Sequence, residues 1–237
     1  GKSICYQLPA LMLEGTAIVV SPLISLMKDQ VESLRANGIA ARALNSNNND
    51  TENVMLRREC IQGKVKLLYI SPERLLMEMD YLLKEIKVSL FAIDEAHCIS
   101  QWGHDFRPEY TQLKAIREQF PSVPIVALTA TADKITRQDI IKQLALKNPQ
   151  TFISSFDRPN LSLDVRRGYH QKEKTRTILE FIFKRPNECG IIYCMSRDKT
   201  EKVADMLLRH GIKASVYHAG LSASARDKAQ EDFINDR

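Results

Sequence analysis

Two short stretches, far apart in the sequence, carry side chains that together suit phosphate chemistry. The chain opens with Gly1-Lys2-Ser3, which has the form of the end of a G-x-x-x-x-G-K-[ST] phosphate loop. In such a loop Lys2 reaches the β and γ oxygens, Ser3 binds Mg²⁺, and backbone N–H groups such as that of Gly1 hold the phosphates. Three residues also arise by chance, so this interpretation depends on the sequence downstream.

The second stretch is Asp94-Glu95-Ala96-His97, directly after the apolar run 90–93. A parallel strand there would deliver both carboxylates to the carboxyl edge of a sheet, where ligands bind. Phosphoryl transfer needs one group to hold Mg²⁺ and another to orient the attacking water. We therefore assign Asp94 to the metal and Glu95 to the water, although an acidic turn that caps a helix dipole explains the same pair without catalysis.

Thr129 and Thr131 end another apolar run. Two short hydroxyl side chains at a sheet edge would suit a sensor of the γ-phosphate. The alternative is that they cap the helix expected at 133–146.

Residues 98–110, here called the aromatic loop, interleave aromatic and cationic side chains behind the two carboxylates. These side chains are Trp102, Phe106 and Tyr110, which offer stacking faces for unpaired bases, and His104 and Arg107, which suit phosphate or carboxylate. Aromatic core packing is the alternative. The segment has no helical or strand period before Pro108, which favours a functional loop.

The elements that would position these residues follow an α/β pattern. Short β-branched runs predict strands at 16–20, 66–70, 88–93 and 123–128. Between them lie amphipathic stretches such as the one from Leu23 to Leu34, which closes at Gly38 as a helix does. Alternating strands and helices indicate the α/β class.

A polar segment at 154–168 interrupts this alternation, and we take it as the domain junction. The predicted domains are 1–156 and 157–237. In the second, we expect helices at 175–183 and 198–210, strands at 190–194 and 214–217, and a last helix, which together make an incomplete unit.

The composition fits a globular chain of more than one domain: 237 residues, 44% hydrophobic and 27% charged. No apolar run approaches the roughly 20 residues that cross a bilayer, and no secretory signal is visible. The five cysteines form no C-x-x-C pair, so we expect buried free thiols rather than disulfides or a zinc site. The net charge of +5 suits a polyanionic partner without identifying one.

Taken together, the motifs resemble those of the RecQ helicases, in order and over the whole chain. The matching segments are GKSICYQLPAL (1–11), SPLISLMKDQ (21–30), ISPERL (70–75), DEAHCISQWGHDFRPEY (94–110), ALTATA (127–132), FDRPNL (156–161), GIIYCMSR (190–197) and YHAGLS (217–222). DEAH alone indicates only a superfamily-2 helicase, whereas the aromatic loop is the feature similar to RecQ.

The resemblance implies an ATP-dependent 3′-to-5′ DNA helicase of DNA repair and recombination. It implies two RecA-like lobes of the P-loop NTPase type, with parallel sheets flanked by helices. The implied cofactors are ATP and Mg²⁺. The implied partners are single-stranded and duplex DNA, and no membrane is implied. Lys2, Ser3, Asp94 and Glu95 match the nucleotide positions already described.

The resemblance also assigns roles that the residues alone do not. His97 and Gln101 match positions that link the ATP state to the DNA-binding loop, and Trp102, Phe106 and Arg107 match the coupling loop. Further residues lie in motifs similar to strand-contacting ones, where local capping or packing is the alternative: Ser21, Lys28, Ser196, Arg197, His218 and Gly220.

We expect this chain to be a fragment truncated at both ends of such an enzyme. The adenine-recognising segment, the arginine finger and the zinc-binding domain of the family would lie outside it, so we expect weak hydrolysis at most. An RNA-directed DEAH-type helicase and a non-catalytic nucleic-acid-binding module remain alternatives. The expected location is the cytoplasm and nucleoid of a bacterium or the nucleus of a eukaryote, where single-strand-binding or repair proteins are possible partners.

Overall fold

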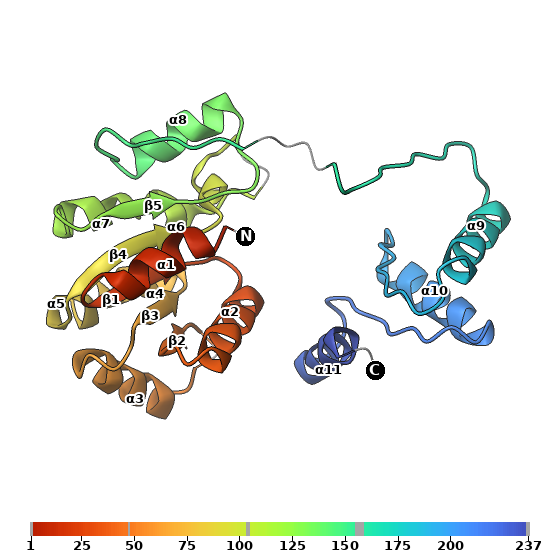
Figure 1. Ribbon diagram of the computed structural model, residues 1–237, viewed down its shortest axis with the longest axis horizontal. Helices are drawn as coiled ribbons and strands as arrows, with labels where there is room; N and C mark the ends of the chain where they lie inside the picture. The colour runs from red at the N-terminus through yellow and green to blue at the C-terminus, as the bar shows by residue number, and fades with distance from the viewer. Residues whose placement is uncertain (1, 47, 103–104, 155–158, 236–237) are drawn as a thin grey trace. The chain divides into compact units, whose positions relative to one another are not determined.

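The computed structural model describes residues 2–46, 48–102, 105–154 and 159–235 (Figure 1). Contacts divide the chain into two compact units, 1–153 and 154–237. The domain boundary predicted between residues 156 and 157 lies outside the described residues.

The first unit is built on a five-stranded sheet in the order β2-β3-β1-β4-β5, with every described pairing parallel. The strands are β1 (Thr16–Val20), β2 (Ala41–Leu44), β3 (Leu67–Ile70), β4 (Val88–Ile93) and β5 (Ile125–Ala127). The α/β class and the parallel sheet flanked by helices are thereby confirmed. Only β2 was missed, because Ala-Arg-Ala-Leu contains no β-branched residue.

Helices pack on both faces of this sheet (Figure 1). They are α1 (Ile4–Met12), α2 (Ile24–Ala36), α3 (Asp50–Ile61), α4 (Pro72–Glu78), α5 (Leu82–Glu85), α6 (Pro108–Thr111), α7 (Lys114–Gln119) and α8 (Lys134–Gln143), with a 3-10 turn, η1 (Ala96–Ile99). Helices α1 and α2 share one core with Ala17 and Val19, while α3 to α8 share the other with Ile18 and Val20. Successive strand residues thus enter opposite cores, which is why these strands read as unbroken apolar runs.

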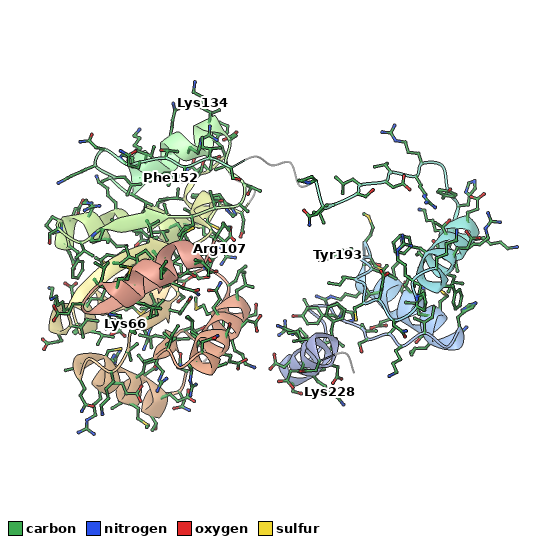
Figure 2. The ribbon with its side chains drawn as sticks, viewed as in Figure 1. Lys66, Arg107, Lys134, Phe152, Tyr193 and Lys228 are labelled. Carbon is green, nitrogen blue, oxygen red and sulfur yellow. The ribbon has the colours of Figure 1, made fainter. Side chains whose placement is uncertain are left out.

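The second unit holds helices α9 (Gln171–Phe183), α10 (Arg197–Arg209) and α11 (Ala223–Ile234). Its described residues contain no strand, so the strands predicted at 190–194 and 214–217, and with them a sheet in this unit, are not formed there. A strand is stable only beside a partner that satisfies its backbone groups and covers its side chains. Here Tyr193, labelled in Figure 2, is 91% exposed, and its neighbour Ile191 is also exposed.

Within the part of the chain that the structure describes, no helix combines the length and the apolar character that a membrane crossing requires.

Gly15 is the residue on which the entry to β1 depends. Its φ is +107°, and an added Cβ would lie 2.3 Å from the carbonyl oxygen of Lys87, which also accepts a hydrogen bond from the Thr16 N–H at 2.9 Å. A side chain would therefore push β1 away from the start of β4.

We expect Gly15→Ala to lower the free energy of unfolding of this unit by about 3 kcal/mol or more, the sum of left-handed strain and the clash. The matched control is Gly63→Ala, where φ is +69° but nothing lies within 4 Å of the added carbon. That variant should lose only the strain, about 1–2 kcal/mol. Urea unfolding followed by the fluorescence of Trp102, the one tryptophan of the chain, measures both; equal losses would contradict the clash.

Candidate active site

The end of β4 places two adjacent carboxylates between the ends of its neighbouring strands. The Asp94 N–H donates to Val20 O of β1 at 2.8 Å, and beyond β5 the Leu128 N–H donates to Ile93 O at 2.9 Å. Because the strands are parallel, their carboxyl ends meet at this edge. The position predicted for Asp94 and Glu95 is the one that the structure shows.

Glu95 has an unusual backbone. Its φ and ψ are 46° and 45°, in the left-handed region that residues with a side chain seldom adopt. The Glu95 N–H donates to Asp94 Oδ1 at 3.0 Å, and the Ala96 N–H donates to Leu128 O at 2.9 Å. This turn ends β4 and begins η1 at once, and such strain concentrates at functional sites.

The Glu95 carboxylate contacts two of the other predicted residues. Lys2 Nζ lies 3.3 Å from Oε1, and His97 Nδ1 lies 3.3 Å from Oε2. The Lys2 and Glu95 side chains are only partly exposed, whereas His97 is buried. The fold thus joins the Gly-Lys-Ser and Asp-Glu-Ala-His stretches at one carboxylate.

Thr129 completes this group. His97 Nδ1 lies 2.9 Å from Thr129 Oγ1, whose hydroxyl donates to the Thr131 carbonyl at 3.1 Å. With its own proton so used, the hydroxyl accepts from a protonated His97 Nδ1. The cap of α8 is instead Asp133, whose carboxylate accepts from the Thr136 N–H at 2.8 Å, so capping does not explain Thr129.

Ser3, the first residue before α1, is held by a residue that the sequence reasoning missed. Gln30 Nε2 donates to Ser3 Oγ at 2.9 Å, and Gln30 Oε1 accepts from the hydroxyls of Tyr6 at 2.9 Å and Tyr69 at 3.0 Å. One amide therefore links α1, α2 and β3 beneath the predicted magnesium ligand.

A signal for Gln30 was present in the sequence. It follows Met27 by three residues and precedes Leu34 by four, and both of these are buried. That spacing places Gln30 in the core stripe of α2. A polar side chain there must find partners inside the protein.

Asp94 is partly buried. Burial raises its pKa above the ordinary value for an aspartate, with the neighbouring Glu95 carboxylate adding to the effect, while the Glu95 N–H and Lys2 oppose it. A nearby cation would offset this cost.

The aromatic loop separates into buried and exposed residues. Tyr110 is wholly buried, and its hydroxyl donates to the Asp94 carbonyl at 3.0 Å. The prediction that Tyr110 offers a stacking face to unpaired bases was therefore wrong. Trp102 is 79% and Phe106 36% exposed. The position of His104 lies outside the described residues.

Hydrogen bonds connect the aromatic loop to α8 and to the segment that follows β1. Ser100 Oγ donates to Asp139 of α8 at 2.7 Å and accepts from the Trp102 N–H at 3.3 Å. Arg107, labelled in Figure 2, donates to Pro22 O at 3.2 Å and lies 3.4 Å from Asp105 Oδ2.

The other predicted residues of this unit are scattered. Gly1 lies outside the described residues, and Lys28 and Gln101 are exposed. Ser21 is 3% exposed, so contact between its side chain and DNA would require a local rearrangement.

Three predicted residues of the second unit lie close together. Gly220 donates its N–H to His218 Nδ1 at 3.1 Å, and a Cβ on Gly220 would come within 3.2 Å of the Arg197 side chain. His218 Nε2 lies 3.2 Å from Glu201 Oε1. Ser196 caps α10 by accepting from the Lys199 N–H at 3.3 Å. Their proposed contact with DNA stays a prediction.

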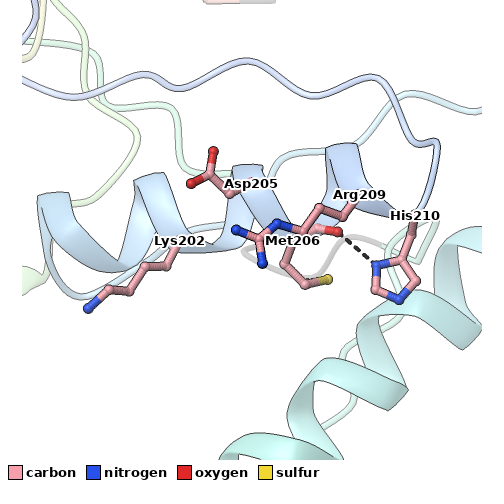
Figure 3. Close-up of a pocket in the computed structure, with 5 residues that line it drawn as sticks. All are labelled: Lys202, Asp205, Met206, Arg209 and His210. Carbon is pink, nitrogen blue, oxygen red and sulfur yellow. Dashed lines mark hydrogen bonds between the residues drawn. The ribbon is translucent and has the colours of Figure 1, made fainter.

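A pocket lies along α10 and its C-cap residue His210 (Figure 3). It is lined by Lys202, Asp205, Met206, Arg209 and His210. His210 Nδ1 lies 2.8 Å from the Met206 carbonyl oxygen. The pocket contains none of the predicted site residues.

Replacing Gln30 tests the polar cluster. Gln30→Leu keeps the approximate volume and removes the partner of three hydroxyls, so we expect a loss of about 1–3 kcal/mol in the free energy of unfolding. Gln62→Leu, at an exposed position, is the control and should stay within about 0.5 kcal/mol. Urea unfolding measures the free energy of unfolding of both variants. An equally small loss in both would show that the hydrogen bonds of Gln30 do not stabilise the fold.

Asp94 gives a pH test. Between its unfolded pKa and its raised folded pKa the folded chain holds more protons, so stability falls as pH rises through that interval. We expect Asp94→Asn to be more stable than the wild type at neutral pH, with the difference closing in acid.

Asp133 should behave in the opposite way, because the Thr136 N–H lowers its pKa. Its contribution to stability is present above the unfolded pKa and is lost as pH falls through the folded pKa. Asp133→Asn should therefore be less stable than the wild type at neutral pH. Urea unfolding across a pH series, with chelator present, measures both variants; a difference of the same sign for both would refute the burial argument.

Comparison with known proteins places the chain in a family. Residues 1–140 match the DEAD/DEAH box helicase family, and residues 173–237 match the helicase conserved C-terminal domain. Proteins named ATP-dependent DNA helicase RecQ from Haemophilus influenzae and Pasteurella multocida are 49% and 50% identical over all of this chain, which spans 38% and 37% of their lengths.

A solved structure agrees on the fold. It is that of S. cerevisiae Dbp5 L327V bound to RNA and ADP BeF3, which is 17% identical with a TM-score of 0.68, over 100% of this chain and 61% of that one. The chain belongs to the DEAD/DEAH box helicases and, among them, to the RecQ family.

Proposed function

We propose that the protein containing this chain is an ATP-dependent DNA helicase. It couples ATP hydrolysis to 3′-to-5′ movement along single-stranded DNA and to duplex unwinding in repair and recombination. The observation that carries the proposal is the Glu95 carboxylate, which contacts Lys2 on one side and His97 on the other, directly before the aromatic loop. The RecQ relatives, named as ATP-dependent DNA helicases, support it.

The donor atoms at the site suit Mg²⁺ and a nucleotide. Ser3 Oγ and the Asp94 carboxylate are oxygen ligands, which Mg²⁺ prefers, and burial of Asp94 raises its pKa, a cost that a cation offsets. Lys2 would hold the phosphates. When bound, the cation and ATP supply the γ-phosphoryl group and neutralise its charge.

Glu95 and Lys2 divide the remaining work. When Lys2 turns from Glu95 to a phosphate, Glu95 Oε1 becomes available to accept a proton from the attacking water. His97 Nδ1 stays beside the second oxygen at 3.3 Å, which limits rotation of the carboxylate. Lys2 would thus neutralise the negative charge of Glu95 before ATP binds and that of the phosphate afterwards.

The aromatic loop supplies the link to DNA. Trp102 is exposed for stacking on an unpaired base, while its backbone is tied through Ser100 to α8. The Arg107 N–H donates to Cys98 O at 2.9 Å, so movement of the loop reaches the residue next to His97.

Such an enzyme works where chromosomal DNA lies, in a bacterial nucleoid or a nucleus.

ATP hydrolysis by the full-length protein, with and without single-stranded DNA, tests the assignments. We expect Glu95→Gln to lower hydrolysis by about 10²-fold or more. Trp102→Ala should keep basal hydrolysis and lose its stimulation by DNA. Tyr81→Ala, which removes an exposed aromatic side chain elsewhere in the unit, should change neither.

Four outcomes would contradict the proposal. Full hydrolysis by Glu95→Gln would remove the catalytic assignment, and full stimulation of Trp102→Ala would remove the role of the loop. Faster unwinding of RNA than of DNA duplexes would favour an RNA helicase, and single-strand affinity without hydrolysis would favour a non-catalytic binding module.

A further inference from the structure

Three side chains beside the catalytic carboxylate direct ligand atoms toward one another. Cys98 Sγ lies 3.9 Å from His97 Nε2 and 3.8 Å from Asp105 Oδ2. The nitrogen, sulfur and carboxylate oxygen atoms of the three residues lie within 4.8 Å of one another. The proposed function gives the side chains of Cys98 and Asp105 no role.

His97 directs its two ring nitrogens toward different groups: Nδ1 faces Thr129 and Glu95, and Nε2 faces Cys98. When the Thr129 hydroxyl donates to the Thr131 carbonyl, it can accept only from a protonated Nδ1. The Nε2 atom of that tautomer has a lone pair, and it faces Cys98 Sγ. The Glu95 carboxylate lies 3.3 Å from Nδ1, which reproduces the carboxylate-histidine arrangement that orients many metal-binding histidines.

The separations are close to those of a tetrahedral site. With metal bonds of about 2.3 Å to sulfur and about 2.0–2.2 Å to nitrogen and oxygen, neighbouring ligand atoms lie about 3.4–3.6 Å apart. The two distances to sulfur exceed this by a few tenths of an ångström, and all three ligand atoms lie within 4.8 Å of one another, so rotation of the half-exposed Asp105 side chain would have to close the site. The Asp105 side chain is 47% exposed, so a cation can enter from the solvent and keep a water ligand there.

We propose that His97 Nε2, Cys98 Sγ and Asp105 Oδ2 form a three-ligand site for a borderline divalent cation of the Zn²⁺ class, separate from the magnesium site. One thiolate, one imidazole and one carboxylate suit Zn²⁺ or Co²⁺, whereas Mg²⁺ prefers oxygen ligands alone. The inference does not rest on the helicase function, because it concerns only these described side chains.

Binding of the cation changes the protonation of Cys98 and the partner of Asp105. Burial raises the pKa of the Cys98 thiol to about 12, so the thiol proton leaves to solvent as the sulfur-metal bond forms. Asp105 Oδ2, which lies 3.4 Å from the Arg107 guanidinium, turns to the metal. The occupied site therefore detaches Arg107 from Asp105 and fixes His97 beside Glu95, joining the aromatic loop to the catalytic turn.

Titration of the 237-residue chain with Co²⁺ tests the site. The background carries Cys5→Ser, Cys189→Ser and Cys194→Ser, which removes the exposed and half-buried thiols. We expect a near-ultraviolet charge-transfer band from one thiolate, a change in Trp102 fluorescence, and reversal of both by excess Zn²⁺.

Two variants identify the ligands. Cys98→Ser should abolish the charge-transfer band, and Asp105→Asn, at a solvent-facing position, should keep the band and weaken Co²⁺ binding at least about tenfold. Cys60→Ser, which changes a buried thiol elsewhere, should leave both unchanged. Circular dichroism verifies that each variant is folded.

Absence of a thiolate band in the background protein, or an unchanged band in folded Cys98→Ser, would overturn the proposal. An unchanged affinity in Asp105→Asn would overturn the three-ligand site. None of these results depends on ATP hydrolysis or on DNA.

Discussion

Strand β4 is buried on both faces and held between two parallel neighbours, and the positions of the reactive residues depend on this constraint. An unpaired carboxylate within a buried strand would be costly, whereas the end of the strand leaves room for partners. The Asp94 N–H still belongs to the sheet, through its bond to Val20 O, whereas Glu95 already has a left-handed backbone. The change from sheet to turn within one residue is what exposes two adjacent carboxylates at the sheet edge.

Glu95 then connects segments that are distant in the sequence. It pairs with Lys2 at the start of the chain and with His97, which in turn contacts Thr129 beyond β5. Each contact occupies an oxygen or a nitrogen that chemistry at the site would also use. The proposed binding of a phosphate by Lys2 would therefore change the charge around Glu95, and the turn that follows Glu95 leads directly into the aromatic loop.

The sequence predicts the parts of this arrangement that follow from burial alone. Strands β1 and β4 match their predicted bounds because a strand buried on both faces must be an unbroken apolar run. The contacts at Gln30 and Tyr110 were not predicted, since periodicity gives the face of a helix but not the partner across the core. The predicted strands at 190–194 and 214–217 were wrong for a related reason. An apolar run shows that a segment is able to form a strand, but the strand forms only beside a neighbouring strand, and the local sequence does not identify that neighbour.

His97 shows how one side chain can separate two kinds of chemistry. Its Nδ1 faces Thr129 and Glu95, on the side of the oxygen ligands suited to Mg²⁺ and phosphate. Its Nε2 faces Cys98, on the side of a softer ligand set. A Thr129 hydroxyl that donates its proton to the Thr131 carbonyl favours a proton on Nδ1, as does the Glu95 carboxylate beside it. A threonine on a different segment and the Glu95 carboxylate thus both act on the ring through Nδ1, while Nε2 faces Cys98.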